Sequence, residues 1–243
     1  GMCYNPSMKI LVLDTETTGN EPAKDRLCQV CWAVDGVYHT EYFKPPVPIS
    51  VKSMSITHIT NKMVADKPPF QGSPFEKDLE AALADHILVA HNAKFDMAML
   101  AAEGVKVPRH ICTLRVARHL DAENKIPEFG LQFLRYFLDL DVDAIAHDAE
   151  GDVRVRGARF DRRRAKLKAS GTYADDAAAL DAMCRISETP SFIAVFPFGK
   201  YKGVRVADVA KTDRGYLEWL LKQKLSDETP DEDWIFTLKT YVG

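Results

Sequence analysis

The chain has 243 residues, of which 46% are hydrophobic and 28% charged, a composition typical of a soluble globular protein with one large domain, or one domain and a small appendage. No apolar run approaches the ~18 residues of a transmembrane helix, so none is expected. The net charge of −3 gives no overall attraction to nucleic acid, so any such binding must come from local patches.

The first predicted element is a strand that runs into two acids. Residues 10–13 are all apolar, which is typical of a strand buried on both faces. Asp14 and Glu16 follow, and because residues two apart in a strand point to the same face, both carboxylates project the same way. Like charges at the end of an apolar strand repel each other and are costly to desolvate. A bound Mg²⁺ or Mn²⁺, which favours carboxylate oxygen, would relieve both costs.

Strands and helices then alternate up to residue 137. Asp35-Gly36 lies between two strand-like runs and is a strong signal for a hairpin turn. The expected elements are, in chain order, strands at 27–34 and 37–43, a short helix following residues 53–60, a helix at 74–84, a strand at 87–90, a helix that Gly104 ends, a strand at 110–113, and helices at 114–120 and 131–137.

A third acid lies where the strand at 87–90 gives way to a helix. Asn92 is the expected N-cap of this helix. Asp96 then falls within its first two turns. The acid is therefore expected near the carboxyl end of a buried strand.

A fourth acid, Asp152, lies in a further helix that residues 144–153 open, and His147 is expected on the loop before it. Residues 154–168 carry eight basic side chains against a single acid, Asp161. Two interpretations stay open for this stretch: a solvated helix face, which charge runs usually form, or a surface that binds phosphate. Residues 173–186 are expected to form another helix.

The composition changes after a boundary at residues 187–191. We call residues 191–243 the C-terminal module, and residues 8–186 the predicted main domain. The module opens with the aromatic, basic and glycine-punctuated sequence F-P-F-G-K-Y-K-G at residues 196–203. It is expected either to form a marginal small domain or to pack on the main body. Lys200, Tyr201 and Lys202 suit contact with single-stranded nucleic acid, and a purely packing role is an equal alternative.

The ordered acids resemble the motifs of the DEDD exonuclease superfamily, in the DnaQ-like branch with a histidine in its third motif. The motifs are D-T-E-T-T-G at residues 14–19, H-N-A-K-F-D at 91–96 and H-D-A-E-G-D at 147–152. The branch with tyrosine in the third motif needs an acid four residues after the tyrosine, and neither Tyr136 nor Tyr173 has one. The tail pattern is similar to a module found after exonucleases of the exonuclease X type.

The resemblance implies a ribonuclease H-like α/β fold, with a mixed five-stranded sheet flanked by helices, and 3′→5′ exonuclease activity. Two Mg²⁺ or Mn²⁺ ions are the expected cofactors, because a metal pair can clamp the attacking and leaving oxygens of a phosphodiester. Asp14, Glu16 and Asp152 would hold the first ion, and Asp14 and Asp96 the second. His147 would act as the base, since its ordinary pKa of about 6.5 suits proton transfer near neutrality.

The expected substrate is the 3′ end of single-stranded DNA, in repair or proofreading, with release of 5′-mononucleotides. The candidate substrate-binding residues are Thr15, Thr17, His58, Asn92 and Phe95, although core packing is the stronger interpretation of Phe95. An exoribonuclease is one alternative, and a non-catalytic nucleic-acid binder is another, against which the intact acids argue. A homodimer and a polymerase partner are both compatible with the sequence, but no polymerase-binding tail is recognisable.

The number and spacing of the cysteines indicate the cellular compartment in which the protein is expected. The five cysteines are scattered and odd in number, which favours a reducing cytosol. Cys28-x-x-Cys31 has no second pair to complete a zinc site, so buried structural thiols are expected there. The N-terminus lacks the pattern of a signal peptide. The sequence thus predicts a cytoplasmic protein without membrane contact.

Overall fold

A mixed five-stranded sheet of order β3-β2-β1-β4-β5 forms the centre of the computed structural model, which describes residues 9–121, 123–139, 149–169, 173–227 and 230–243. The strands are β1 (Lys9–Thr17), β2 (Leu27–Val34), β3 (Val37–Tyr42), β4 (His86–Ala90) and β5 (His110–Cys112). β1, β2 and β3 form an antiparallel meander, whereas β4 and β5 run parallel to β1. The predicted fold class is therefore confirmed.

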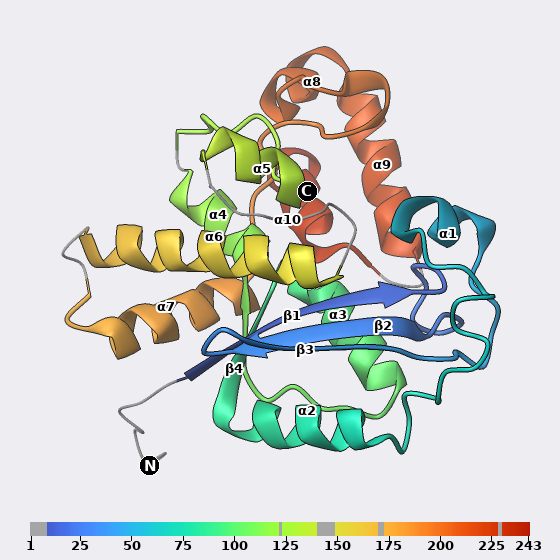
Figure 1. The fold of residues 1–243 in the computed structure, drawn as a ribbon. Helices are drawn as coiled ribbons and strands as arrows, with labels where there is room; N and C mark the ends of the chain where they lie inside the picture. The colour runs from blue at the N-terminus through green and yellow to red at the C-terminus, as the bar shows by residue number, and fades with distance from the viewer. Residues whose placement is uncertain (1–8, 122, 140–148, 170–172, 228–229) are drawn as a thin grey trace.

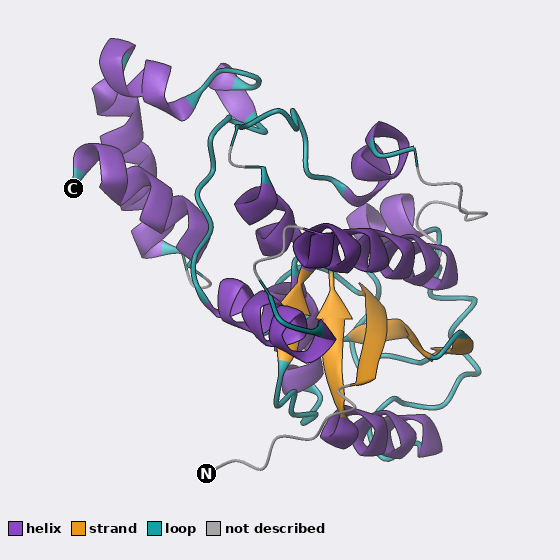
Figure 2. Ribbon diagram, turned by 90° about the vertical axis from the view of Figure 1, so that its left-hand side faces the viewer, coloured by secondary structure: helices purple, strands orange, loops and turns teal. Residues whose placement is uncertain are grey.

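Helices cover both faces of this sheet (Figures 1 and 2). The helices are α1 (Val51–Thr57), α2 (Pro74–Asp85), α3 (Ala93–Ala102), α4 (Thr113–Leu120), α5 (Leu131–Phe137), α6 (Ala149–Ala169), α7 (Asp176–Glu188), the 3₁₀ turn η1 (Gly199–Tyr201), α8 (Val206–Thr212), α9 (Arg214–Ser226) and α10 (Glu232–Val242). Helices α2 and α3 pack on one side of the sheet, and α6 and α7 on the other.

The alternation of side chains along β1 decides on which face of the sheet the acids lie. Leu11 and Leu13 belong to the core on the side of α2 and α3. Val12 belongs to the core on the opposite side, which α6 and α7 complete. Asp14 and Glu16 share the parity of Val12, so they project toward α6.

Local departures from the predicted elements have identifiable causes. β1 continues beyond its apolar run to Thr17, because β2 pairs with it up to that residue, with a register shift between Glu16 and Thr17. The helix expected from residue 173 begins at Asp176, where the Asp175 side chain accepts the backbone N–H of Ala178 and caps it. The hairpin turn is as predicted, with positive φ at both Asp35 and Gly36.

The C-terminal module builds a hydrophobic cluster of its own. Phe196, Leu217 and Trp234 belong to this cluster. The glycines of the F-G-K-Y-K-G sequence have a structural reason, since both Gly199 and Gly203 adopt positive φ. Phe196 and the half-buried Tyr201 of this sequence pack within the cluster, which supports the packing interpretation for these two aromatic residues.

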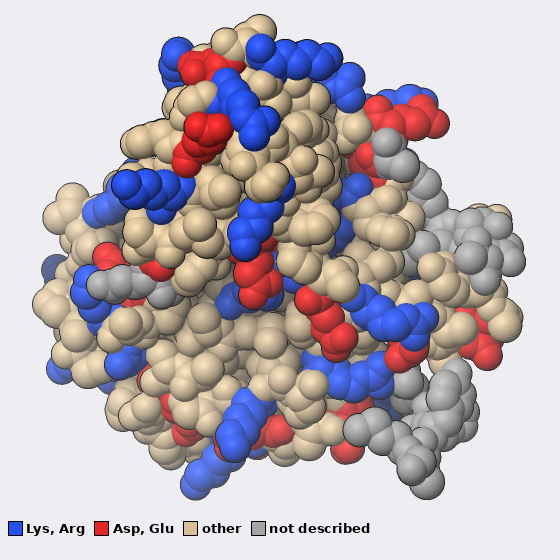
Figure 3. Space-filling view, turned by 180° about the vertical axis from the view of Figure 1, so that it is seen from behind, with Lys and Arg blue, Asp and Glu red and all other residues tan. Residues whose placement is uncertain are grey.

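Within the described ranges, no helix is both long and apolar enough to cross a bilayer. Figure 3 shows basic and acidic side chains interspersed over the face opposite to that of Figure 1. The described cysteines, at 28, 31, 112 and 184, are buried free thiols, as expected for structural ones.

Candidate active site

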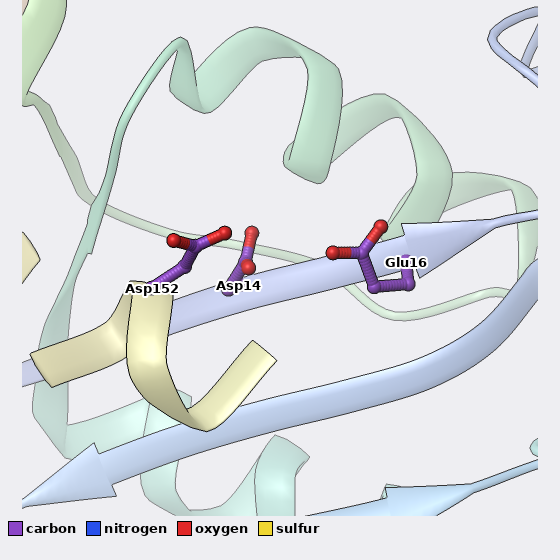
Figure 4. A group of neighbouring side chains, drawn as sticks. All are labelled: Asp14, Glu16 and Asp152. Carbon is purple, nitrogen blue, oxygen red and sulfur yellow. The ribbon is translucent and has the colours of Figure 1, made fainter. Parts of the chain in front are cut away.

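Three of the four predicted acids form one cluster at the carboxyl end of β1. Asp14 and Glu16 come from β1, and Asp152 comes from the first turn of α6 (Figure 4). Each offers a carboxylate oxygen that lies within 4.8 Å of the others. Val153, the residue after Asp152, packs in the core beneath α6 with Val12. This packing holds the first turn of α6 over the acid end of the strand.

Two hydrogen bonds fix the orientation of the acids. Gln132 of α5 donates from Nε2 to Oδ1 of Asp152 at 2.8 Å. Thr15 donates its hydroxyl to Oδ1 of Asp96 at 2.9 Å, and Asp96 lies in the first turn of α3 as predicted. Asp96 is buried beside the three-acid cluster rather than within it.

Arg156 fills the space between Asp14 and Asp96, and the sequence analysis missed it. It lies one turn after Asp152 on α6 and is only 8% exposed. Its guanidinium forms an ion pair with Oδ1 of Asp14, lies 3.8 Å from Oδ2 of Asp96, and donates to the carbonyl oxygen of Leu13 at 2.8 Å. The only signal in the sequence was the i,i+4 spacing from Asp152, which was hidden among many other arginines.

Burial and mutual repulsion make the acids hold protons more tightly than usual. The pKa of Glu16 is raised to about 9, chiefly by burial and then by the neighbouring carboxylates of Asp14 and Asp152. Burial also raises the pKa of Asp14 and of Asp96, while Arg156 opposes the rise in both. A cluster that must share protons near neutral pH is electrostatically suited to a cation.

The metal-free protein is therefore expected to lose stability as pH rises, and Glu16→Gln to reduce this loss. The pKa of Glu16 is about 4.5 when unperturbed and about 9 in the folded protein, so the folded state binds more protons throughout this window. The contribution of Glu16 to the free energy of unfolding is complete at low pH and is lost as pH rises toward about 9. Urea unfolding in chelator at several pH values between 6 and 9 measures the slope.

The matched control for this measurement is Glu21→Gln. Glu21 is an exposed acid that pairs with Lys24 on the surface. This variant should keep the wild-type slope. An equal slope in wild type and Glu16→Gln would contradict the expected proton uptake by the cluster.

The candidate substrate-binding residues fall into two groups. Thr15 and Thr17 are buried, and their hydroxyls donate within the protein, to Asp96 and to the carbonyl oxygen of Gly19 respectively. This favours a supporting role for both threonines over contact with substrate. His58 is exposed at the end of α1, with positive φ. Helix α1 is tied to the end of β1 by Ser53, whose hydroxyl donates to the carbonyl oxygen of Thr17.

Asn92 and Phe95 line a cavity of about 650 Å³ between α3, α4 and the C-terminal module. Arg115 and Trp234 also line it. Phe95 is half-buried, so it both packs against the core and borders the cavity. Asn92 is the N-cap of α3, as predicted, but it has positive φ and its side chain makes no capping hydrogen bond.

His147 lies outside the described residues. The basic stretch at 154–168 continues α6 without interruption. Arg154 pairs with Glu150 and lies over the ring of Tyr38, whereas Arg156 is buried in the site. The stretch is therefore not one uniform solvated face.

Comparison with known proteins matches both parts of the chain. A family model described as an exonuclease of the RNase T type matches residues 11–158, and one described as exodeoxyribonuclease X-like C-terminal matches residues 196–224. The chain is 31% identical over 236 residues to exodeoxyribonuclease 10 of Escherichia coli K12, covering 95% of this chain and 97% of that protein. It is 33% identical over 154 residues to DNA polymerase III subunit epsilon of Treponema pallidum, covering 58% and 70%.

A solved structure agrees with these matches. The structure of exonuclease X in complex with 5′-overhanging duplex DNA superposes with a TM-score of 0.57 at 25% identity, covering 73% of this chain and 99% of that one. The similarity therefore extends to the fold as well as to the sequence.

Proposed function

The chain belongs to the exonuclease family of the RNase T type, and from this premise we propose that it removes nucleotides one at a time from the 3′ ends of single-stranded DNA, releasing 5′-mononucleotides. The observation that carries the proposal is the meeting of Asp14, Glu16 and Asp152 within 4.8 Å at the end of β1. DNA is favoured as substrate because one relative is named an exodeoxyribonuclease and another was solved with DNA.

Enzymes of this family depend on divalent metal ions, and the acid cluster fits one. Its donors are carboxylate oxygens, the ligands that Mg²⁺ and Mn²⁺ prefer. Oδ2 of Asp14 is also buried and, among the described residues, accepts no hydrogen bond. Such a bound ion supplies an activated water and stabilises charge on the phosphate. The sequence predicts two such ions, one of them shared by Asp14 and Asp96.

The chain's own residues have separate roles in this proposal. Gln132 and Thr15 orient Asp152 and Asp96 through the hydrogen bonds described above. His147 takes the proton of the attacking water, a role that rests on its spacing from Asp152 in the third motif. The cavity beside Asn92 and Phe95 receives nucleotides upstream of the terminal one, with aromatic rings available for stacking.

Digestion of 3′-labelled strands tests the proposal. Single-stranded DNA, blunt duplex DNA and RNA of one sequence are incubated with the full chain and Mg²⁺ or Mn²⁺. The expected result is release of labelled 5′-mononucleotide, fastest from single-stranded DNA, and none in excess chelator. His147→Ala assayed in parallel tests the base, and unchanged turnover would contradict that role.

Other outcomes of the same assay distinguish the alternatives. Faster release from RNA than from DNA would favour the exoribonuclease, since the two substrates differ in the 2′-hydroxyl that a site can read. Binding of DNA without any hydrolysis would favour the non-catalytic binder. We also propose that residues 8–186 and 191–243 are separate units, which the hydrophobic cluster of the C-terminal module supports.

A further inference from the structure

The two oxygens of Asp14 have different surroundings. Oδ1 forms an ion pair with the guanidinium of Arg156. Oδ2 is buried and accepts no hydrogen bond from any described residue. Burying a carboxylate oxygen without a hydrogen-bond partner costs free energy. A bound cation at Oδ2 would offset this cost. On the other side of the same carboxylate, a cation is already built into the chain.

The position of Arg156 is fixed by more than its charge. Its Nη1 donates to the carbonyl oxygen of Leu13 at 2.8 Å, a backbone atom of β1 that cannot move without the sheet. The side chain leaves α6 one turn after Asp152 and is 8% exposed. A guanidinium does not lose its proton in proteins, so the positive charge is permanent.

A divalent ion shared by Asp14 and Asp96 would compete for this space. Mg²⁺ binds carboxylate oxygen at about 2.0–2.1 Å, so an ion held by both acids must lie between them. The guanidinium lies there now, in contact with Asp14 and 3.8 Å from Oδ2 of Asp96. The two cations would repel each other strongly in a buried site.

We propose that Arg156 takes the place of the second divalent ion, so that the protein without DNA binds a single ion, at Asp14, Glu16 and Asp152. This rests on the proposed function, because it assumes that the acid cluster is the metal site. The guanidinium then supplies the positive charge on the side of Asp96, and Arg156 is a charge-compensating residue of the site rather than part of a phosphate-binding surface.

Counting bound Mn²⁺ tests this proposal without measuring activity. The full chain, free of DNA, is titrated with Mn²⁺ while free ion is followed by electron paramagnetic resonance. Wild type should bind about one ion per chain with measurable affinity, and Arg156→Gln about two, because the amide is neutral and leaves the Asp14–Asp96 side open. Arg156→Lys keeps a cation and should stay at about one.

Arg154→Gln is the matched control. Arg154 lies on the same helix, is exposed and pairs with Glu150, so its replacement should leave the count at about one. Two ions in wild type, or one ion in a folded Arg156→Gln, would overturn the inference. No ion in wild type would refute the metal site and the inference together, whereas one ion without hydrolysis of any strand would refute the function alone.

Discussion

Asp152→Asn is expected to lower the rate of nucleotide release by about 10³-fold or more while leaving the fold and the binding of DNA largely intact. A metal ion contributes several kcal/mol of transition-state stabilisation, and each 1.36 kcal/mol is about tenfold in rate. Asparagine keeps the shape of the side chain and an oxygen that can accept the bond from Gln132. Single-turnover release from 3′-labelled DNA, with binding measured in chelator, separates the two effects.

Asp152 is a cleaner position for this test than Asp14. Asp14 is the ion-pair partner of Arg156, so Asp14→Asn changes both the metal site and the internal charge balance. Asp152→Asn instead removes a like charge that raises the pKa of both Asp14 and Glu16, so the metal-free variant should be no less stable than wild type. Glu150→Gln, in the same first turn but paired with Arg154 on the surface, is the control. Persistent rapid hydrolysis by Asp152→Asn would refute the metal assignment.

The positions of the acids could be predicted from the sequence because they depend on the local secondary structure. The parity of Val12, Asp14 and Glu16 places both acids on one face of a buried strand, and this holds however the rest of the chain folds. The position of Asp96 followed similarly from the strand-to-helix change at Asn92. The order of the motifs, rather than any one of them, then indicated that the acids meet.

What the sequence could not predict depends on long-range contacts. Arg156 reaches a carbonyl oxygen 143 residues away in the chain, and its neighbours in sequence include similar arginines with different surroundings. Asn92 is the N-cap residue of α3 as predicted, but it has positive φ and its side chain makes no capping hydrogen bond. Residue type and spacing do not reveal which side chains are buried or hydrogen-bonded in this way, because their partners lie on other helices and strands.

The attachment of the C-terminal module is a further contact of this kind. Asp233, in the first turn of α10, accepts hydrogen bonds from Arg115 and Arg118 of α4, both at 2.7 Å. The backbone N–H and the hydroxyl of Ser191 donate to the same carboxylate. Asp233 is 7% exposed and Arg115 is 4% exposed, so this is a buried ion pair between the module and the main body.

Asp233→Ala is expected to destabilise the full chain by about 3–5 kcal/mol, because it leaves Arg115 buried without its closest carboxylate. Glu232→Ala is the matched control. Glu232 precedes Asp233 on α10 and contacts Arg115 at 3.3 Å, but its side chain is 47% exposed. Its replacement should cost less than about 1 kcal/mol, and both variants lose a helix-terminal acid equally.

Urea unfolding followed by tryptophan fluorescence measures both variants, since Trp234 lies on α10 and Trp32 in the sheet. Trp234 also lines the cavity beside Asn92 and Phe95, so a module released from α4 would take one wall of that cavity with it. The KM for single-stranded DNA should then rise more in Asp233→Ala than in Glu232→Ala, because Glu232 also lines the cavity but its replacement leaves the module attached. Equal stability losses in the two variants would mean that the surface pair holds the module as firmly as the buried one, and the buried ion pair would lose its assigned role.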